Sequence, residues 1–257
     1  MVNSLENIYI SPLELCNLRC LYCYTNKTKS ILTNDQILNF VEEYSHQLRS
    51  ENCQLRSIIF CGGEVFTLPD FPTLVNQLIK KGIFITIITN GTVDRLNEID
   101  DPRNCQLIVS FDGPEKVHDA NRGLGNFNKS KKFVAKALKL DFPVEIFYLI
   151  TKDSYLYKDK LDIFGQHITY LTDRLGSLTP EQVADIRNNY PCYPPKDFGC
   201  NILSLQSNGK FYGCCESARS IGSLADPLDK IIKNYVDVTT RHPLCYDPDF
   251  HCGLAQN

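Results

Sequence analysis

Three cysteines lie close together near the start of the chain, in the segment LELCNLRCLYCYTN. Cys16, Cys20 and Cys23 are separated by three and then two residues and directly follow an apolar, β-rich run, so their thiolates can converge in one short loop. A [4Fe–4S] cluster bound by only three cysteines keeps one iron open for a non-protein ligand. A structural zinc ion would need a fourth protein ligand, and no histidine or further cysteine stands nearby. The spacing therefore predicts a metal cluster with an open site for chemistry.

Residues suited to ligand binding also follow the second and third β-rich runs. The second run ends in Gly62, Gly63 and Glu64, where glycines let the backbone approach a ligand and a carboxylate can bind an ammonium group. The third run leads into Thr89 and Asn90. A plain turn would explain Gly-Gly-Glu alone, but we expect the carboxyl ends of parallel strands to share one edge. These residues are therefore predicted to lie beside the three cysteines.

The fourth β-rich run continues into the segment SFDGPEKVHDANRG. Ser110 and Asp112 stand at the end of this run, and Arg122 follows in the segment after it. Taken singly, they could be a serine on a buried strand, an N-capping aspartate and a solvated arginine. Together with the preceding motifs they favour one binding site.

The elements that position these residues alternate in a simple way from about residue 7 to 175. Short β-rich runs and helical stretches follow one another, which is typical of βα units around a parallel sheet. The expected strands are Ile8–Leu13, Ser57–Cys61, Ile83–Thr89, Leu107–Phe111, Val144–Ile150 and Ile168–Thr172. The expected helices are Asn34–Leu48, Leu74–Lys81, Asp94–Ile99, Ser130–Leu140, Tyr157–Phe164 and Pro180–Asn189.

After Gly176 the sequence becomes loop-rich, and this tail holds six of the twelve cysteines. The segment LSLQSNGKFYG predicts a hairpin with a type I′ turn at Asn208 and Gly209. Because a short loop-rich segment buries little apolar surface, we expect a metal to hold the tail together.

Composition excludes some classes of function. The formal net charge is -3 and no Lys/Arg block dominates any stretch, which argues against nucleic-acid or membrane-surface binding. The N-terminus lacks a secretory signal, and no segment has the length of a membrane span, so a cytoplasmic protein is expected. In that reducing compartment, cysteines at motif spacing bind metal more often than they form disulfides. Cys53, Cys61 and Cys105 lie on or near apolar runs and are expected to be core residues.

The C-x3-C-x2-C motif, with the aromatic Tyr22 before its last cysteine, resembles the radical S-adenosylmethionine (SAM) superfamily. The resemblance implies an α/β fold, a partial (β/α)6 TIM-like barrel over residues 1–176. It also implies a [4Fe–4S] cluster whose open iron binds SAM, and a 5′-deoxyadenosyl radical that abstracts hydrogen from a substrate. The cofactor-binding residues would be Tyr22, Gly62, Gly63, Glu64, Thr89, Asn90, Ser110, Asp112 and Arg122.

The run S-x-D-G-x4-H-D-x2-R-G and the tail most resemble the SPASM/twitch branch of that superfamily. Residues 177–257 would then form a small cysteine-rich extension with one auxiliary [4Fe–4S] cluster. The resemblance gives its ligands as Cys200, Cys214, Cys245 and Cys252. Cys192 and Cys215 are rival ligands, and a structural zinc ion would suit four thiolates equally well.

Enzymes of this branch that modify ribosomally synthesised precursor peptides (RiPP maturases) are the most similar in these motifs. Crosslinking, epimerisation and backbone excision are the implied reactions. Only about seven residues precede the first expected strand, so we expect a separate small leader-recognition protein, and an external flavodoxin- or ferredoxin-type electron donor. Three alternatives stay open: dehydrogenation of an aminocyclitol or sugar alcohol, formylglycine formation in a sulfatase, and a metal-binding scaffold without enzyme activity.

Position alone suggests the catalytic residues. Asp112, His118 and Arg174 are the candidates, and Tyr148 and Asp173 are expected to face the substrate from the fifth and sixth strands. Each could equally be a surface or packing residue.

Overall fold

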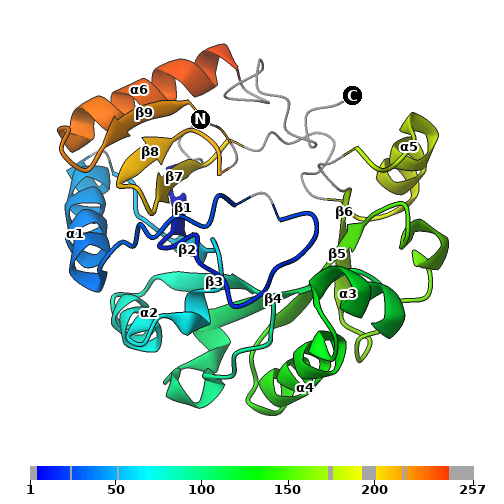
Figure 1. The fold of residues 1–257 in the computed structure, drawn as a ribbon. Helices are drawn as coiled ribbons and strands as arrows, with labels where there is room; N and C mark the ends of the chain where they lie inside the picture. Colours follow the sequence, from blue (N-terminus) through cyan, green and yellow to red (C-terminus); the bar gives the residue numbers. More distant parts are fainter. Residues whose placement is uncertain are drawn as a thin grey trace.

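A computed structural model describes residues 5–23, 25–50, 52–172, 176–192, 201–215, 217 and 219–242. In this part of the chain nine strands form one sheet, in the order β6-β5-β4-β3-β2-β1-β7-β8-β9. The sheet curves into an incomplete ring with the helices outside it (Figure 1). No helix in the described ranges is long and apolar enough to cross a membrane.

The first six strands are all parallel and lie in sequence order. They are β1 (Asn7–Ser11), β2 (Ser57–Phe60), β3 (Phe84–Thr89), β4 (Cys105–Phe111), β5 (Val144–Ile150) and β6 (His167–Thr172). The helices are α1 (Asn34–Ser50), α2 (Phe71–Lys80), α3 (Glu115–Arg122), α4 (Asn126–Lys139), α5 (Pro180–Asn189) and α6 (Leu228–Arg241). This confirms the predicted α/β fold with a parallel sheet.

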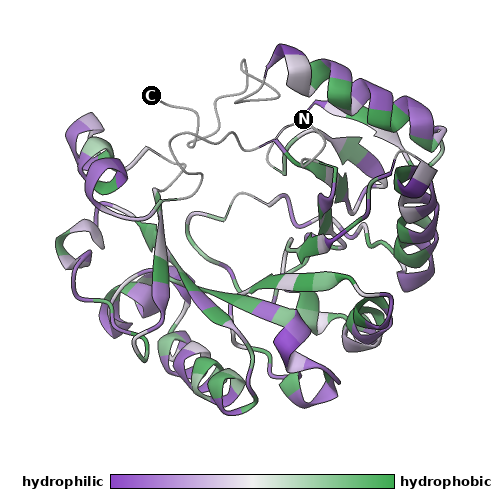
Figure 2. Ribbon diagram, turned by 180° about the vertical axis from the view of Figure 1, so that it is seen from behind, coloured by the Kyte–Doolittle hydropathy of each residue, from purple (hydrophilic) through white to green (hydrophobic). Residues whose placement is uncertain are grey.

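Alternation along the strands explains why the ring has two different faces. In β5, Ile146, Tyr148 and Ile150 are fully buried, whereas Phe147 and Leu149 are only half-buried because they face the inside of the ring. Figure 2 shows hydrophobic residues concentrated on the strands and hydrophilic residues on the outer sides of the helices. The apolar core therefore lies between the sheet and the helices, and the inner face is left to a cavity.

Local signals set several helix boundaries as predicted. At the start of α1, the Gln36 N–H donates to Thr33 Oγ1 (3.2 Å) and the Thr33 N–H donates to Gln36 Oε1 (2.9 Å), a reciprocal capping box. Thr179 and Gln182 make the same arrangement at the start of α5. Such a cap satisfies two of the N–H groups that a helix leaves without partners at its start.

Two expected helices are absent and two unexpected ones are present. The predictions of helices at Asp94–Ile99 and Tyr157–Phe164 are wrong. The first segment contains only the 3-10 turn η3 (Leu96–Glu98), and the second overlaps the 3-10 turn η5 (Tyr155–Tyr157) only at its first residue. In the first, the Leu96 N–H donates to the Asp94 side chain, which competes with helical bonding. Helix α3 buries only His118 and Asn121, so it carries no apolar stripe that would predict it.

The described tail adds to the same sheet. The predicted hairpin is present as β7 (Leu203–Gln206) and β8 (Lys210–Tyr212), with β9 (Ser220–Ser223) beside it, and β7 pairs in parallel with β1. The predicted type I′ turn is wrong. Such a turn needs positive φ at both Asn208 and Gly209, but of these two residues Gly209 alone has it (+73°), and the Gly209 N–H donates to the Gln206 carbonyl.

The expectation that the tail buries little apolar surface is also wrong. Helix α6 buries Leu228, Ile231, Ile232 and Tyr235, and it packs over β9. Packing therefore stabilises the tail whether or not it holds a metal. The division of the chain at residue 176 stays a prediction, because β7 to β9 continue the sheet of the ring.

Candidate active site

A cavity of about 760 Å³ lies on the inner face of the sheet. The side chains of Cys16, Cys20 and Cys23 line one end of it, where the segment that follows β1 crosses the ring (Figure 1). Gly63 and Asn90, from the carboxyl ends of β2 and β3, line the same cavity. The structure therefore brings the first three predicted motifs together.

The loop with the three cysteines rests on the Gly-Gly-Glu turn after β2. The Gly63 N–H donates to the Leu13 carbonyl (2.8 Å) and the Glu64 N–H donates to the Leu15 carbonyl (3.0 Å). A Cβ atom on Gly63 would lie 1.8 Å from the Leu15 oxygen, so only glycine permits this approach. At least one glycine of the motif is thus required to hold the cysteine loop itself.

Glu64 is fully buried and points to the end of β3. Its carboxylate accepts hydrogen bonds from Thr89 Oγ1 (2.8 and 2.9 Å), the Asn90 N–H (2.9 Å) and the Phe66 N–H (3.3 Å). Desolvation raises the pKa of Glu64, and these hydrogen bonds oppose that shift. The carboxylate thereby joins the ends of β2 and β3 immediately behind the cysteine loop.

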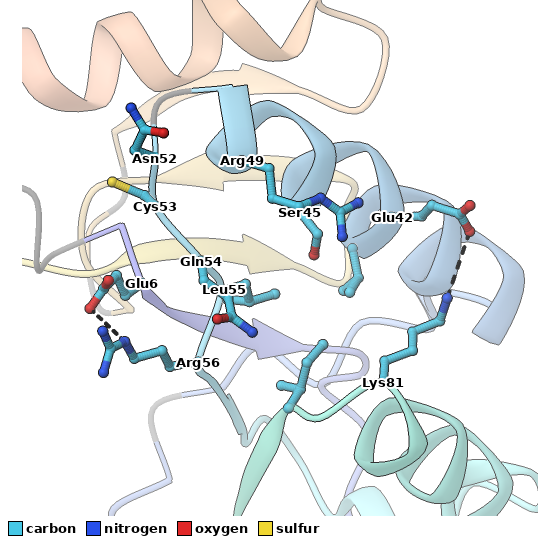
Figure 3. Close-up of a pocket in the computed structure, with 12 residues that line it drawn as sticks. Glu6, Glu42, Ser45, Arg49, Asn52, Cys53, Gln54, Leu55, Arg56 and Lys81 are labelled. Carbon is cyan, nitrogen blue, oxygen red and sulfur yellow. Dashed lines mark ion pairs between the residues drawn. The ribbon is translucent and has the colours of Figure 1, made fainter.

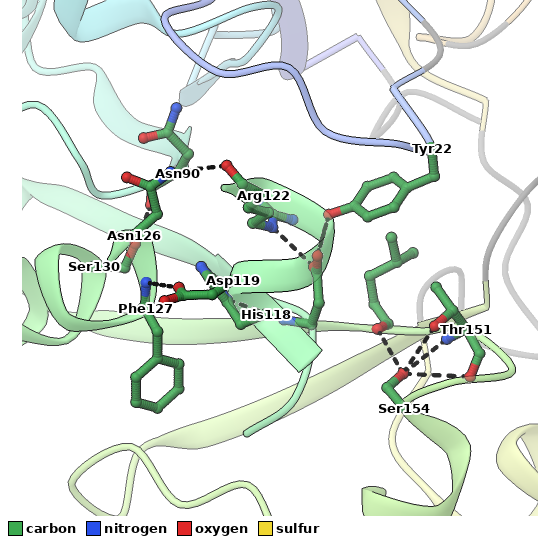
Figure 4. A network of polar contacts seen from close by, with 12 residues as sticks. Tyr22, Asn90, His118, Asp119, Arg122, Asn126, Phe127, Ser130, Thr151 and Ser154 are labelled. Carbon is green, nitrogen blue, oxygen red and sulfur yellow. Dashed lines mark hydrogen bonds and ion pairs between the residues drawn. The ribbon is translucent and has the colours of Figure 1, made fainter. Parts of the chain in front are cut away.

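Asp112, which is buried, and the partly buried Tyr22 and Arg122 form a group that we call the clamp. Figure 4 shows Tyr22 and Arg122 pointing toward one another. The Tyr22 hydroxyl lies 2.7 Å from both oxygens of Asp112, and Arg122 Nε donates to Asp112 Oδ1 at 2.9 Å. The Arg122 guanidinium also lies 5.6 Å from the centre of the Tyr22 ring. Beside the clamp, the Leu21 N–H donates to the Asn121 carbonyl (3.1 Å). The clamp therefore fastens the cysteine loop to β4 and α3.

Burial dominates the electrostatics of the clamp. Asp112 is fully buried, and desolvation raises its pKa, while the charge of Arg122 opposes that shift. A buried carboxylate that keeps a hydrogen-bonded arginine is stable only as a pair, because either partner alone would be an uncompensated buried charge.

A second hollow, of about 690 Å³, lies at the amino ends of β1 to β3, outside the ring (Figure 3). Its charged side chains are largely paired with one another: Arg56 with Glu6 (3.0 Å) and Lys81 with Glu42 (3.8 Å). None of the predicted site residues lines it, so we assign the chemistry to the cavity inside the ring.

The family model of the radical SAM superfamily matches residues 10–154, which is more than half of the chain. This chain belongs to the radical SAM superfamily. The matched range contains the three cysteines, the Gly-Gly-Glu turn and the clamp.

Known proteins resemble this one at modest identity. The AdoMet-dependent heme synthase of Methanosarcina barkeri is 29% identical over 146 residues, covering 53% of this chain and 40% of that protein. The radical SAM cyclopropyl synthase TigE of Paramaledivibacter caminithermalis is 27% identical over 175 residues, covering 60% of this chain and 36% of that protein. The chain thus spans about two fifths of the length of these two relatives.

Solved structures share the fold. The structure of anSMEcpe with bound AdoMet and Cp18Cys peptide has a TM-score of 0.69 at 18% identity, covering 93% of this chain and 81% of that chain. Streptococcus suis SuiB bound to precursor peptide SuiA has a TM-score of 0.66 at 16% identity, covering 89% of this chain and 64% of that chain.

The cysteine loop suits the [4Fe–4S] cluster and SAM that membership of the radical SAM superfamily implies. Desolvation raises the pKa of the Cys16 and Cys20 thiols. The hydrogen bond from the Leu18 N–H opposes this shift at Cys16, and the charge of Arg122 opposes it at Cys20. Bound iron supplies the positive charge that keeps such thiols deprotonated. Among the described residues no three His, Cys, Asp or Glu side chains are placed to hold one metal ion, but in a cluster each cysteine binds its own iron.

Some of the other predicted residues of this radical SAM protein line the cavity, and others are buried behind it. Ser110 and Arg122 line the cavity, and Asp112 lies behind them within the clamp. His118 is buried away from the cavity, between Phe111 and Phe127, and burial lowers its pKa to about 3. Its Nδ1 accepts the Asp112 N–H at 3.4 Å, and its Nε2 has no hydrogen-bond partner among the described residues.

Tyr148 is fully buried, and its hydroxyl donates to the Ser154 and Tyr157 carbonyls (3.4 and 3.2 Å), so it does not face the cavity as expected. The predicted residues Asp173, Arg174, Cys200, Cys245 and Cys252 lie outside the described residues.

The remaining cysteines lie in three kinds of place. Cys53, expected in the core, packs against it but is only partly buried and lines the hollow outside the ring. Cys105 is buried in the core as expected, and Cys214 is buried beside Ile221 and Val238. Cys61, expected in the core, instead lines the cavity, and so do Cys192 and Cys215. Cys61 continues the inward alternation of β2, because Ile59 two residues earlier also lines the cavity.

Sequence reasoning missed the polar residues at the amino end of the cavity, including Glu145 and Thr169. The signal for Glu145 was present: it is the one charged residue in the run VEIFYLI, two positions before the inward Phe147.

Proposed function

We propose that this radical SAM enzyme modifies a ribosomally synthesised precursor peptide by crosslinking, epimerisation or backbone excision. The observation that carries the proposal is the cavity, which extends from the three cysteines along the inner faces of β1 to β6 and offers apolar walls to an extended substrate. The likeness of the fold to the structures of anSMEcpe with a bound peptide and of SuiB with its precursor peptide supports the same substrate class.

When bound, the cluster and SAM supply a 5′-deoxyadenosyl radical that abstracts a hydrogen atom from the substrate. The residues of the chain would hold and shield these groups. Cys16, Cys20 and Cys23 would bind the cluster, and the clamp would fix the loop that carries them. Gly62, Gly63, Thr89, Asn90 and Ser110 would contact SAM, since all of them line the cavity. Apolar walls exclude water, which protects a reactive radical from side reactions.

We also propose an auxiliary [4Fe–4S] cluster in the tail. Of the described candidates, Cys192 and Cys215 line the cavity, whereas Cys214, two residues after β8, is buried against Ile221 and Val238. This arrangement favours Cys192 and Cys215 for a cluster that faces the substrate, with Cys200, Cys245 and Cys252 as further candidates. Iron analysis tests the proposal: about eight irons per chain support it, and about four contradict it.

A separate leader-recognition protein, an external flavodoxin- or ferredoxin-type electron donor and a cytoplasmic location complete the proposal. The oxygen-sensitive chemistry of an open iron site supports a reducing compartment.

Coexpression with short peptides encoded beside its gene tests the function. Mass spectrometry should show a peptide that loses two hydrogens, takes up solvent deuterium, or loses a backbone fragment, and Cys16→Ala should abolish the change. Failure to alter any neighbouring peptide, together with oxidation of an aminocyclitol or sugar alcohol by the same preparation, would replace the peptide function with a dehydrogenase function.

A further inference from the structure

Glu145 places a carboxylate inside the cavity, at the end opposite the cysteines. It is the second residue of β5 and lines the cavity together with His167 and Thr169 of β6. The cysteine loop follows the carboxyl end of β1, and β1 to β6 are parallel, so Glu145 and the cysteines lie toward opposite ends of the strands. The five steps from Glu145 to Ile150, the last residue of β5, span about 16 Å along the strand.

Neighbouring side chains hold this carboxylate in place. Thr169 Oγ1 donates to Glu145 Oε1, and Gln106 Nε2 donates to Glu145 Oε2 at 3.2 Å. Gln106 is itself held by Thr86 Oγ1, which donates to its Oε1 at 3.4 Å. A line of polar contacts thus runs across the inner faces of β3 to β6 and orients the carboxylate before any ligand arrives.

The carboxylate keeps capacity for a further partner. A carboxylate offers about four acceptor positions, and the two donors above use two of them. None of the ion pairs formed among the described residues includes Glu145. Carboxylates inside proteins are normally paired, so this one is suited to receive a cation from a ligand.

The walls between the two ends are apolar. Ile88, Ile108, Phe147, Leu149 and Leu171 line the cavity from β3 to β6. An apolar passage with a carboxylate at its end matches the side chains of lysine and arginine, whose methylene stems pack on apolar surface while the charged group binds a carboxylate.

We propose that Glu145 binds the side-chain cation of a lysine or arginine in a peptide that lies in the cavity. This inference rests on the proposed peptide function and names the residue type that such a peptide carries near its reactive position. The span of about 16 Å favours a peptide over a single sugar ring, because about three extended residues and a long side chain cover that distance.

Matched probes test the proposal on the reconstituted, SAM-loaded enzyme under anaerobic conditions. Ligand-observed NMR compares acetyl-Gly-Lys-Gly-amide with its neutral twin, the same peptide with norleucine in place of lysine. It also compares acetyl-Gly-Arg-Gly-amide with a neutral twin that has citrulline in place of arginine. We expect the wild type to bind at least one charged peptide about tenfold more tightly than its neutral twin. Glu145→Gln, which keeps the shape and the hydrogen bond from Thr169, should reduce that preference to about twofold or less.

The exposed Glu43 supplies the control, since Glu43→Gln makes the same chemical change on the outer surface of α1 and should keep the preference. Equal binding of both twin pairs by the wild type overturns the proposal, even if Glu145→Gln does not fold. A preference that survives in folded Glu145→Gln also overturns it.

A third pair of probes, cyclohexylamine and cyclohexanol, tests whether the site prefers a small amine-bearing ring to a peptide. A failure of the peptide function on which this inference rests can then be told apart from a failure of the inference itself. A preference for the ring amine without any preference for the charged peptides overturns the proposal and points to an amine-bearing small substrate instead. Because binding is measured without reductant, the result does not depend on turnover. Release of 5′-deoxyadenosine by the same preparation shows separately that the radical chemistry is intact.

Discussion

The two ends of the cavity are built differently. At the carboxyl end of the strands, the cysteine loop is fixed by the Gly-Gly-Glu turn, by Glu64 behind it and by the clamp. At the amino end, Glu145 has two neutral donors and no cation paired with it in the described part of the chain. The first end is completed by contacts within the chain, whereas the second leaves acceptor positions on Glu145 for the cation proposed above. We infer that the former serves the shared radical chemistry and the latter serves substrate choice.

The largest effect is expected from crowding the cysteine loop. Gly63→Ala would place a Cβ atom 1.8 Å from the Leu15 carbonyl oxygen, so the loop must move away from the turn. We predict loss of most of the cluster iron after reconstitution, measured by iron analysis and by visible absorption.

Gly82→Ala is the matched control for that substitution. Gly82 has positive φ (+80°) and open space around its missing Cβ, so alanine there should cost about 1 kcal/mol through backbone strain and leave the iron content unchanged. Equal iron contents in the two variants would contradict the role assigned to the turn.

The clamp should show the next largest effect. Arg122→Gln leaves the buried Asp112 carboxylate without its cation, and breaking a buried pair in this way costs about 3–5 kcal/mol. Urea unfolding of the apo protein measures the loss. In the double variant Asp112→Asn with Arg122→Gln, part of that loss should return, because no buried charge remains. Additive losses would show that the two side chains do not act as a pair.

The pH dependence of stability reports on His118, which lies directly behind the clamp. Its pKa is about 3 in the folded protein and about 6.5 when unfolded, so the unfolded chain binds one more proton between those values. The contribution of neutral His118 to the unfolding free energy is therefore complete above pH 6.5. As the pH falls below that value, this contribution decreases by up to about 1.4 kcal/mol per pH unit.

His118→Phe keeps a ring between Phe111 and Phe127 and removes the titration. Unfolding free energies at pH 7, 6 and 5 should therefore fall less steeply for this variant than for the wild type. The raised pKa values of Asp112 and Glu64 act in the opposite direction but are common to both proteins. Parallel slopes would reject the burial of a neutral His118.

The smallest effect is expected at the amino end of the cavity. Thr169→Val removes the hydroxyl that donates to Glu145, which costs about 1 kcal/mol in unfolding free energy. The iron content should stay at the wild-type value, because this residue lies toward the opposite end of its strand from the cysteine loop. Loss of iron in this variant would show that the two ends of the cavity do not act independently.

Local patterns account for the parts of the fold that sequence predicted. The strand Val144–Ile150 and the helix Pro180–Asn189 were predicted with their observed limits, because an apolar run and a Thr179–Gln182 capping box act over a few residues. Helix α3 escaped prediction because its buried residues are polar. The pairing of β7 with β1 joins segments nearly 200 positions apart, which no local pattern encodes.

The same limit applies to the site. The cysteine, Gly-Gly-Glu and SFDG motifs were identifiable because each is a short run of residues. The clamp was not, since Tyr22 and Asp112 are 90 positions apart and meet only when the first and fourth strands curve into one ring. Asp112 was therefore predicted as a ligand contact, although the structure buries it beneath the cysteine loop.

Cleavage of SAM at the cysteine end is the central claim, and one measurement tests it most directly. Reconstituted protein is incubated anaerobically with SAM and dithionite, and 5′-deoxyadenosine is quantified beside a Cys16→Ala variant treated in the same way. We predict 5′-deoxyadenosine from the wild type and none above background from Cys16→Ala. Equal amounts from both proteins, or none from a wild type with its full complement of iron, would contradict the account.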